Sequence, residues 1–208
     1  MLDRPKPAGL GAICCASLLA PCLALVVLAS CRSSTAAIPP IDSSAVQAIT
    51  INESLYGLLP AAPVRAVFHL EPATDCFAGT AEFSVGGISV AVITQSVPIT
   101  VPLPVIEEFL ALLEGTPLKV GEYKPSIIHT DSYPTISITI KGEAGNLRFY
   151  SESQGDMRIP WQVFVTGQGV FVTHSGIPAQ ALGLLDPYRA REVEEGLIDQ
   201  ALAREPEY

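Results

Sequence analysis

Apolar and polar residues alternate along much of the chain, and this pattern constrains the fold more than any other feature of the sequence. In "TAEFSV", residues 80–85, Ala81, Phe83 and Val85 alternate with polar side chains. Successive side chains of a β-strand point to opposite faces of a sheet, so each such segment places its apolar residues on one face. A sheet with one face toward water is typical of antiparallel strands. The alternation therefore predicts a largely antiparallel sheet.

Two hairpins are predicted within this sheet. The first turns at Gly86-Gly87, because glycine accepts the positive φ angles of a two-residue turn, and its second strand begins at residue 88. The second hairpin turns within residues 166–169, between the apolar runs "WQVFV" and "GVFVT". Further strands are predicted at residues 64–70, 136–140 and 147–150.

Three segments depart from the alternation and predict helices. "LPVIEEFLALLEG" predicts a helix over residues 104–114, because Pro104 suits its first turn and Gly115 can end it. A short helix is predicted over residues 178–185, and a last helix after Asp186-Pro187. The last helix has its apolar residues on one face, at Val193, Leu197, Ile198 and Ala201.

Together these elements predict an α+β fold, with one or more antiparallel sheet meanders, a mid-chain helix and C-terminal helices. "LPVIEEFLALL" and "IPAQALGLL" both have a proline in their first turn, and both follow several predicted strands. The chain can therefore be interpreted as two similar halves, each made of strands followed by a helix. One hydrophobic pattern repeated along many strands would give the same impression, so both interpretations stay open.

The first 30 residues have a different character. Arg4 and Lys6 give a short basic end, and no residue from position 7 to position 30 is charged. A basic region followed by an apolar one is the order of a bacterial export signal. A membrane-spanning helix, which needs about 20 apolar residues, is the alternative. Pro21 interrupts the run, and its densest apolar part, residues 18–29, suits a signal better.

The apolar run ends in "LASC", residues 28–31. This tetrapeptide resembles the lipobox of bacterial lipoproteins, in which a branched apolar residue and two small residues precede an invariant cysteine. The resemblance covers this segment alone. It implies that Cys31 receives a diacylglyceryl group, that the chain is cleaved just before it, and that the new amino group is acylated. The protein would then be held by lipid at the cell membrane or outer membrane, facing outside the cytoplasm. An uncleaved anchor and an ordinary secretory signal are the alternatives.

Three parts of the chain follow from this resemblance. They are a signal peptide over residues 1–30, the lipidated Cys31 with a flexible tether up to residue 45, and a single α+β domain over residues 46–208. Ser, Ala and Pro dominate the tether, which shows no apolar periodicity. Cys76 is then the single cysteine of the domain, so no internal disulfide is expected. Without lipidation, Cys31 would be free to pair with Cys76.

The charge balance restricts the partners. The chain has 12 Lys and Arg against 21 Asp and Glu, a net charge of −9, and loss of the signal makes it slightly more acidic. Such acidity argues against nucleic-acid binding and against electrostatic attraction to an anionic membrane surface. The expected partners are membrane lipid, through acylated Cys31, and an envelope protein.

The stretch most suggestive of catalysis is "IIHTDSYP", residues 127–134. His129 and Asp131 stand two apart and would share a face of an extended segment. A carboxylate placed there can orient the imidazole for base catalysis, which makes an envelope hydrolase one alternative function. Asp131 and Ser132 are also typical turn residues, and no GxSxG motif supplies a nucleophile. A turn at the surface is the competing interpretation.

Candidate partner-binding residues are Asp156 and Arg158, in a polar segment, and Trp161, which follows it. Their ordinary roles would be a solvated connection and core packing. No histidine belongs to a metal-ligand spacing, and the GxG at residues 167–169 has no third glycine, so neither a metal nor a cofactor is expected. The leading interpretation is a non-catalytic interaction or envelope-assembly domain. A module that binds a small apolar ligand is the further alternative beside the hydrolase.

Overall fold

The computed structural model describes residues 35–55, 64–86, 91–123, 135–152 and 160–203. All of them belong to one compact unit, Thr35–Tyr208. The predicted signal peptide and Cys31 lie outside the described residues. Among the described helices, none combines the length and the apolar character needed to cross a membrane.

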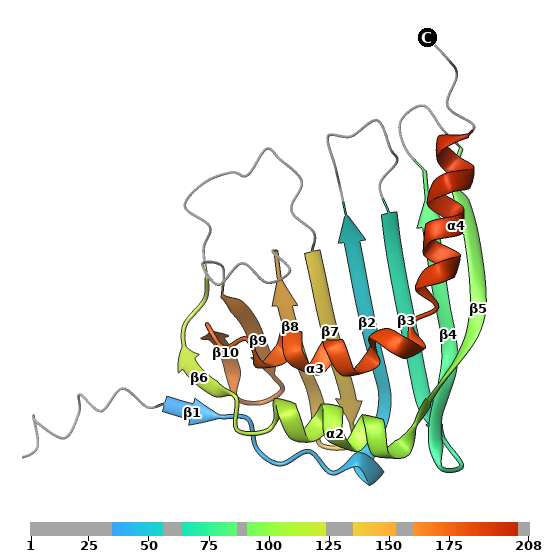
Figure 1. Cartoon of the computed structure of the whole chain (residues 1–208). Coiled ribbons are helices and arrows are strands. Elements are labelled where there is room, and N and C mark those ends of the chain that lie inside the picture. The colour runs from blue at the N-terminus through green and yellow to red at the C-terminus, as the bar shows by residue number, and fades with distance from the viewer. Residues whose placement is uncertain (1–34, 56–63, 87–90, 124–134, 153–159, 204–208) are drawn as a thin grey trace, which may run out of the picture. The chain divides into compact units, whose positions relative to one another are not determined.

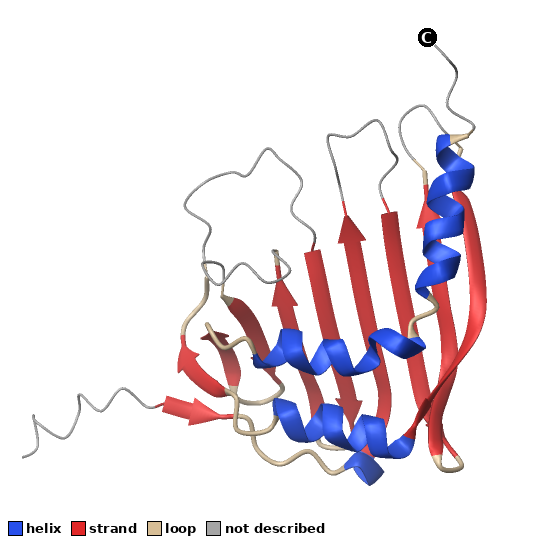
Figure 2. Ribbon diagram, viewed as in Figure 1, coloured by secondary structure: helices blue, strands red, loops and turns tan. Residues whose placement is uncertain are grey.

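The described chain forms one antiparallel sheet of ten strands, with helices against one face (Figures 1 and 2). The strand order is β1-β6-β10-β9-β8-β7-β2-β3-β4-β5. This arrangement confirms the coarser sequence prediction, an antiparallel sheet combined with helices. The strands are β1 (Thr35–Ala37), β2 (Val46–Leu55), β3 (Val64–Ala73), β4 (Cys76–Val85), β5 (Ile93–Pro102), β6 (Pro117–Val120), β7 (Thr135–Gly142), β8 (Gly145–Ser151), β9 (Trp161–Val165) and β10 (Gly169–Thr173).

Two sets of four strands meet in the middle of the sheet. Strands β2 to β5 are neighbours in chain order and are followed by α2 (Leu103–Leu113). Strands β7 to β10 are also neighbours in chain order and are followed by α3 (Ile177–Leu185). The pairing of β2 with β7 joins the two sets, and it places Ile51 opposite Ile138. Strands β6 and β1 extend the sheet beyond β10.

Helices α2 and α3 pack against each other and run in opposite directions across the same face of the sheet (Figure 1). Each has a proline within its first two positions, where a missing N–H costs nothing because that group has no partner inside the helix. A short 3-10 turn, η3 (Asp186–Tyr188), connects α3 to α4 (Arg191–Leu202). Helix α4 packs against β4 and β5 on this face.

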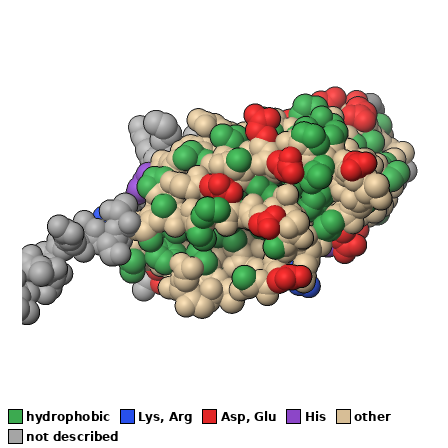
Figure 3. Space-filling view, turned by 90° about the horizontal axis from the view of Figure 1, so that it is seen from below, with side chains coloured by type: hydrophobic (Ala, Val, Ile, Leu, Met, Phe, Trp, Pro, Cys, Tyr) green, Lys and Arg blue, Asp and Glu red, His purple; other side chains and the backbone are tan. Residues whose placement is uncertain are grey.

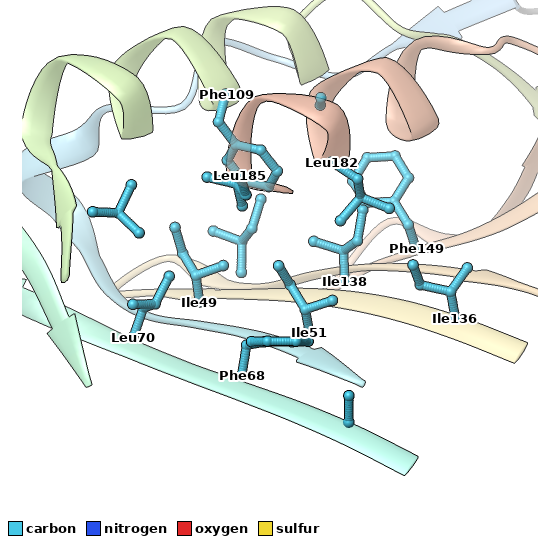
Figure 4. Packing of buried hydrophobic residues seen from close by; sticks show 14 of the residues in the cluster. Ile49, Ile51, Phe68, Leu70, Phe109, Ile136, Ile138, Phe149, Leu182 and Leu185 are labelled. Carbon is cyan, nitrogen blue, oxygen red and sulfur yellow. The ribbon is translucent and has the colours of Figure 1, made fainter. Parts of the chain in front are cut away.

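The hydrophobic core lies between the sheet and these helices. Figure 4 shows Phe109 of α2 together with Leu182 and Leu185 of α3, facing apolar side chains of the strands. Complete burial of one such side chain contributes about 1.5–3 kcal/mol, so the two-residue alternation determines which face of each strand turns inward. The strand residues shown there are Ile49, Ile51, Phe68, Leu70, Ile136, Ile138 and Phe149, all buried.

The predicted turn at Gly86-Gly87 is wrong. Strand β4 ends at Val85, which is paired with Ile93, so the connection runs over residues 86–92 and β5 begins at Ile93 rather than at residue 88. In this register Ile93 packs against the core, whereas Val92 is 68% exposed. The glycine pair does not determine the turn here, because the pairing register that buries the apolar face of the longer strand determines where β5 begins.

The prediction of a flexible tether up to residue 45 is also wrong for residues 35–45, the part that the structure describes. Thr35–Ala37 form β1, and Ser43–Ala45 form a 3-10 turn, η2. Ile38, between them, is only 3% exposed. These apolar residues were not recognised as core because an irregular segment packs without a helical or strand period. The last helix likewise begins at Arg191, since Asp186 and Pro187 belong to η3.

Candidate functional site

An open apolar groove lies at one end of the strands, where the β7–β8 and β9–β10 turns meet the segment before β2. Its volume of about 320 Å³ is at the lower end of the range for ligand pockets, about 300–1,000 Å³. The groove therefore has room for one small apolar group. Its apolar lining consists of Ile38, Pro39, Pro40, Ile41, Ala45, Val46, Ala144, Ile140, Leu147 and Val165.

The first wall of the groove is the segment of residues 38–46, which backbone hydrogen bonds hold against the end of α2. The Ile38 N–H donates to Thr116 O at 3.2 Å, and the Gly115 N–H donates to Ile38 O at 3.0 Å. The Ile41 N–H donates to the Glu114 carboxylate at 2.8 Å. This wall is thus an ordered part of the domain, although its two prolines supply no N–H donors of their own.

The second wall consists of the β7–β8 and β9–β10 turns, which are joined through Thr166. Its hydroxyl accepts a hydrogen bond from the Asn146 N–H at 2.9 Å and donates one to Asn146 O at 3.1 Å. Gly145 has a φ of +128°, and a Cβ there would lie 2.6 Å from Thr166 Cβ. Only glycine permits this close approach of the two turns.

The charged residues that line the groove, Asp42 and Glu143, are both acidic. Asp42 accepts hydrogen bonds from the Ser44 hydroxyl at 2.7 Å and from the Ser44 N–H at 2.9 Å. These bonds favour the charged carboxylate and lower the pKa of Asp42 below its ordinary value. Figure 3, viewed from below, shows acidic side chains dispersed among hydrophobic ones on this side of the molecule. The groove is therefore apolar inside and negative at its rim.

A second polar group lies on the face of the sheet that carries no described helix. Thr50 Oγ1 lies 3.1 Å from His69 Nδ1, and His69 Nε2 lies 3.1 Å from Glu71 Oε1. A hydroxyl, an imidazole and a carboxylate in this order are the parts of an activated nucleophile. The side chains of His69 and Glu71 are 47% and 66% exposed, and neither residue lines the groove. We therefore interpret the group as a solvated hydrogen-bond chain across strands β2 and β3.

A third group is a cluster of ion pairs where α4 begins. Arg189 contacts Glu53 and donates to Asp186 at 2.9 Å, while Arg191 Nη2 lies 3.2 Å from Glu53 Oε2. Burial alone would lower the pKa of Arg191. The hydrogen bond to Glu194 and the charges of Glu53, Glu194 and Asp186 outweigh that effect and raise it. The Arg191 guanidinium thus stays charged, and the two arginines fasten the start of α4 to β2.

The residues singled out in the sequence are not brought together in the described part. His129, Asp131, Asp156 and Arg158 all lie outside the described residues, as does Cys31. Trp161 is 5% exposed and belongs to the hydrophobic core. Cys76 is partly buried and forms no disulfide. Among the described residues, no group of three or more His, Cys, Asp or Glu is placed to hold a metal ion.

Sequence reasoning missed the groove, although "IPPI" at residues 38–41 carried a signal for it. Two isoleucines in a proline-rich segment are too apolar for a solvated tether, and both pack against the core. Glu53 carried a signal as well, because it occupies an inward position in the alternation of β2. A charged residue at such a position indicates a buried partner.

Comparison with known proteins identifies no relative of this chain. No protein-family model matches it, and no curated protein and no solved structure matches it.

Proposed function

We propose that this chain is a bacterial lipoprotein, held through acylated Cys31 at the cell membrane or outer membrane, with a non-catalytic interaction domain facing outside the cytoplasm. The observation that carries the proposal is the apolar groove, whose first wall begins at Ile38, a few residues after the lipobox-like "LASC". Because a fully extended residue spans at most about 3.6 Å, the chain from Cys31 to Ile38 reaches about 25 Å. The groove would thus work close to the membrane surface.

The composition of the groove favours binding as its role. Its walls are mainly aliphatic, and its few polar groups, such as Asn146 and Gln168, lie among them. Pockets of this composition bind by burial of apolar surface and use a small number of polar groups for orientation. An envelope protein that inserts an apolar side chain and a small apolar molecule would both suit such a groove.

The anchor is tested by the variant Cys31→Ala. We expect wild-type protein in the membrane fraction, with an intact mass that shows loss of residues 1–30 and addition of acyl groups. Cys31→Ala should keep its signal uncleaved by the lipoprotein route and show no acyl mass, because the thiol that accepts the lipid is absent. The anchoring energy is large, since each buried methylene contributes about 0.8 kcal/mol.

Cys76→Ala is the matched control, since it removes a cysteine that lies within the folded domain. It should be cleaved, acylated and membrane-bound like the wild type. Acyl groups found on the Cys31→Ala protein, or their absence from the wild type, would contradict the proposed anchor.

We also infer that the two strand sets are similar halves of one duplicated unit. Each set contains four neighbouring antiparallel strands followed by a helix with a proline within its first two positions. The opposite directions of α2 and α3 on one face are what an approximate twofold relation between the halves would produce. The central β2–β7 pair would then lie beside the axis.

A further inference from the structure

We propose that the apolar groove binds one alkyl chain of a zwitterionic, amine-bearing membrane lipid, with the amine near Asp42 and Glu143. This inference rests on the proposed function, because the lipid would come from the membrane to which Cys31 attaches the protein. It goes beyond that function by naming the ligand and the residues that select it.

The shape and lining of the groove support an alkyl chain. Its lining is largely aliphatic, with Ile38 and Ile41 on one wall and Ile140, Leu147 and Val165 on the other. A volume of about 320 Å³ suits part of a single chain. Because the groove is open, the rest of the lipid can extend beyond it.

The rim supports a positively charged head group. Asp42 and Glu143 are the charged residues among those that line the groove, and Asp42 accepts two hydrogen bonds from Ser44. A free fatty acid or an anionic lipid would bring a further negative charge to this rim. A zwitterionic lipid with a primary amine places a cation beside two carboxylates, which can accept its N–H groups.

The position of the groove along the chain supports a lipid from the membrane. Its first wall starts at Ile38, directly after β1, and about 25 Å of extended chain separates that residue from Cys31. For an anchored protein, the chain from Cys31 therefore limits the distance between Ile38 and the membrane to at most about 25 Å. A membrane lipid would thus be within reach of the groove of the anchored domain.

The test uses the mature, full-length protein purified from membranes and reconstituted into phosphatidylcholine vesicles. The vesicles contain a trace of phosphatidylethanolamine or phosphatidylglycerol with a photoreactive diazirine at the end of one acyl chain. After illumination and digestion, mass spectrometry locates the lipid adducts. We expect them on the peptides that contain Ile140, Leu147 and Val165. The phosphatidylethanolamine yield should exceed the phosphatidylglycerol yield by up to about fivefold, the effect of an exposed ion pair.

Ala144→Trp blocks the groove, because Ala144 lines it from an exposed position in the β7–β8 turn. Adducts on the groove peptides should fall to background in this variant. Ala73→Trp is the matched control, since Ala73 is exposed at the end of β3 and is not part of the lining. It should label like the wild type. The double variant Asp42→Asn/Glu143→Gln should keep the adducts and lose the preference for phosphatidylethanolamine.

Two results would overturn the inference: adducts distributed over the surface according to exposure, or groove adducts unchanged by Ala144→Trp. Failure of the anchor is recognised separately by an intact mass without acyl groups. Protein of that kind can still be added to the vesicles from solution, so the groove is tested whichever way the anchor is decided.

Discussion

At the scale of single residues, a charged pair inside the core of the described chain has a large expected effect on stability. Glu53 lies among apolar positions of β2, and Arg189, which is 4% exposed, meets it from the α3–α4 connection. The Arg189 guanidinium also lies 4.5 Å from the centroid of the Phe68 ring. Removal of one member of such a pair leaves the other charge buried without its partner.

We expect Glu53→Leu to lower the free energy of unfolding by about 3 kcal/mol, the lower end of the range for a broken buried pair, because Arg189 keeps Asp186 as a partner. The double variant Glu53→Leu/Arg189→Met should recover most of this loss, since both charges are then replaced by apolar side chains. Urea unfolding followed by circular dichroism measures both. A double variant as unstable as the single one would show that the charge itself is not the cause.

At the scale of elements, the start of α4 depends on an unfavourable backbone conformation. Ala190 has a φ of +48° and a ψ of +45°, the left-handed region, between Arg189 and Arg191. A residue with a side chain loses about 1–2 kcal/mol in this region, whereas glycine does not. The turn allows both arginines to reach Glu53. Contacts of the two arginines thus stabilise a strained link.

We expect Ala190→Gly to raise the free energy of unfolding by about 0.5 kcal/mol, because relief of strain exceeds the entropic cost of a glycine. Ala111→Gly is the matched control. Ala111 is exposed within α2, so the same change should lower stability by about 1 kcal/mol. Urea midpoints compare the two variants. Equal losses in both would mean that the Ala190 conformation carries no strain.

At the scale of the whole molecule, the sequence predicts elements whose signals are local and misses those that depend on pairing. Helix α2 begins within one residue of its prediction because Pro104 and Gly115 mark its ends. The second hairpin is found because its apolar residues and its glycines agree. By contrast, the sequence does not predict β1 and β6, because both are short strands without an alternation of their own. They are identified as strands only by their pairing within the sheet.

The candidate site is less predictable than the fold for the same reason. Its lining comes from three separate segments, residues 38–46, 140–147 and 165–168, and no local motif connects them. The sequence carries only indirect signs, the isoleucines of "IPPI" and the glycine at position 145. The order of the ten strands, which brings these segments together at one end of the strands, follows from tertiary packing and not from any local pattern.

The two strand sets should unfold as one cooperative unit. Strands β2 and β7 pair over most of their length, α2 packs on α3, and α4 returns from the second set to cover β4 and β5 of the first. We therefore expect one transition in urea for the wild type, for Phe109→Ala in α2 and for Leu185→Ala in α3. Both residues are at most 1% exposed, so the free energy of unfolding of each variant should fall by about 3 kcal/mol.

Tryptophan fluorescence reports on Trp161 in the second set, and circular dichroism reports on both sets. In a cooperative unit Phe109→Ala shifts the two signals together. Suppose instead that Phe109→Ala leaves the fluorescence midpoint unchanged and lowers the circular dichroism midpoint. The two halves would then unfold separately, because the packing of α2 on α3 would not couple the stability of one set to that of the other.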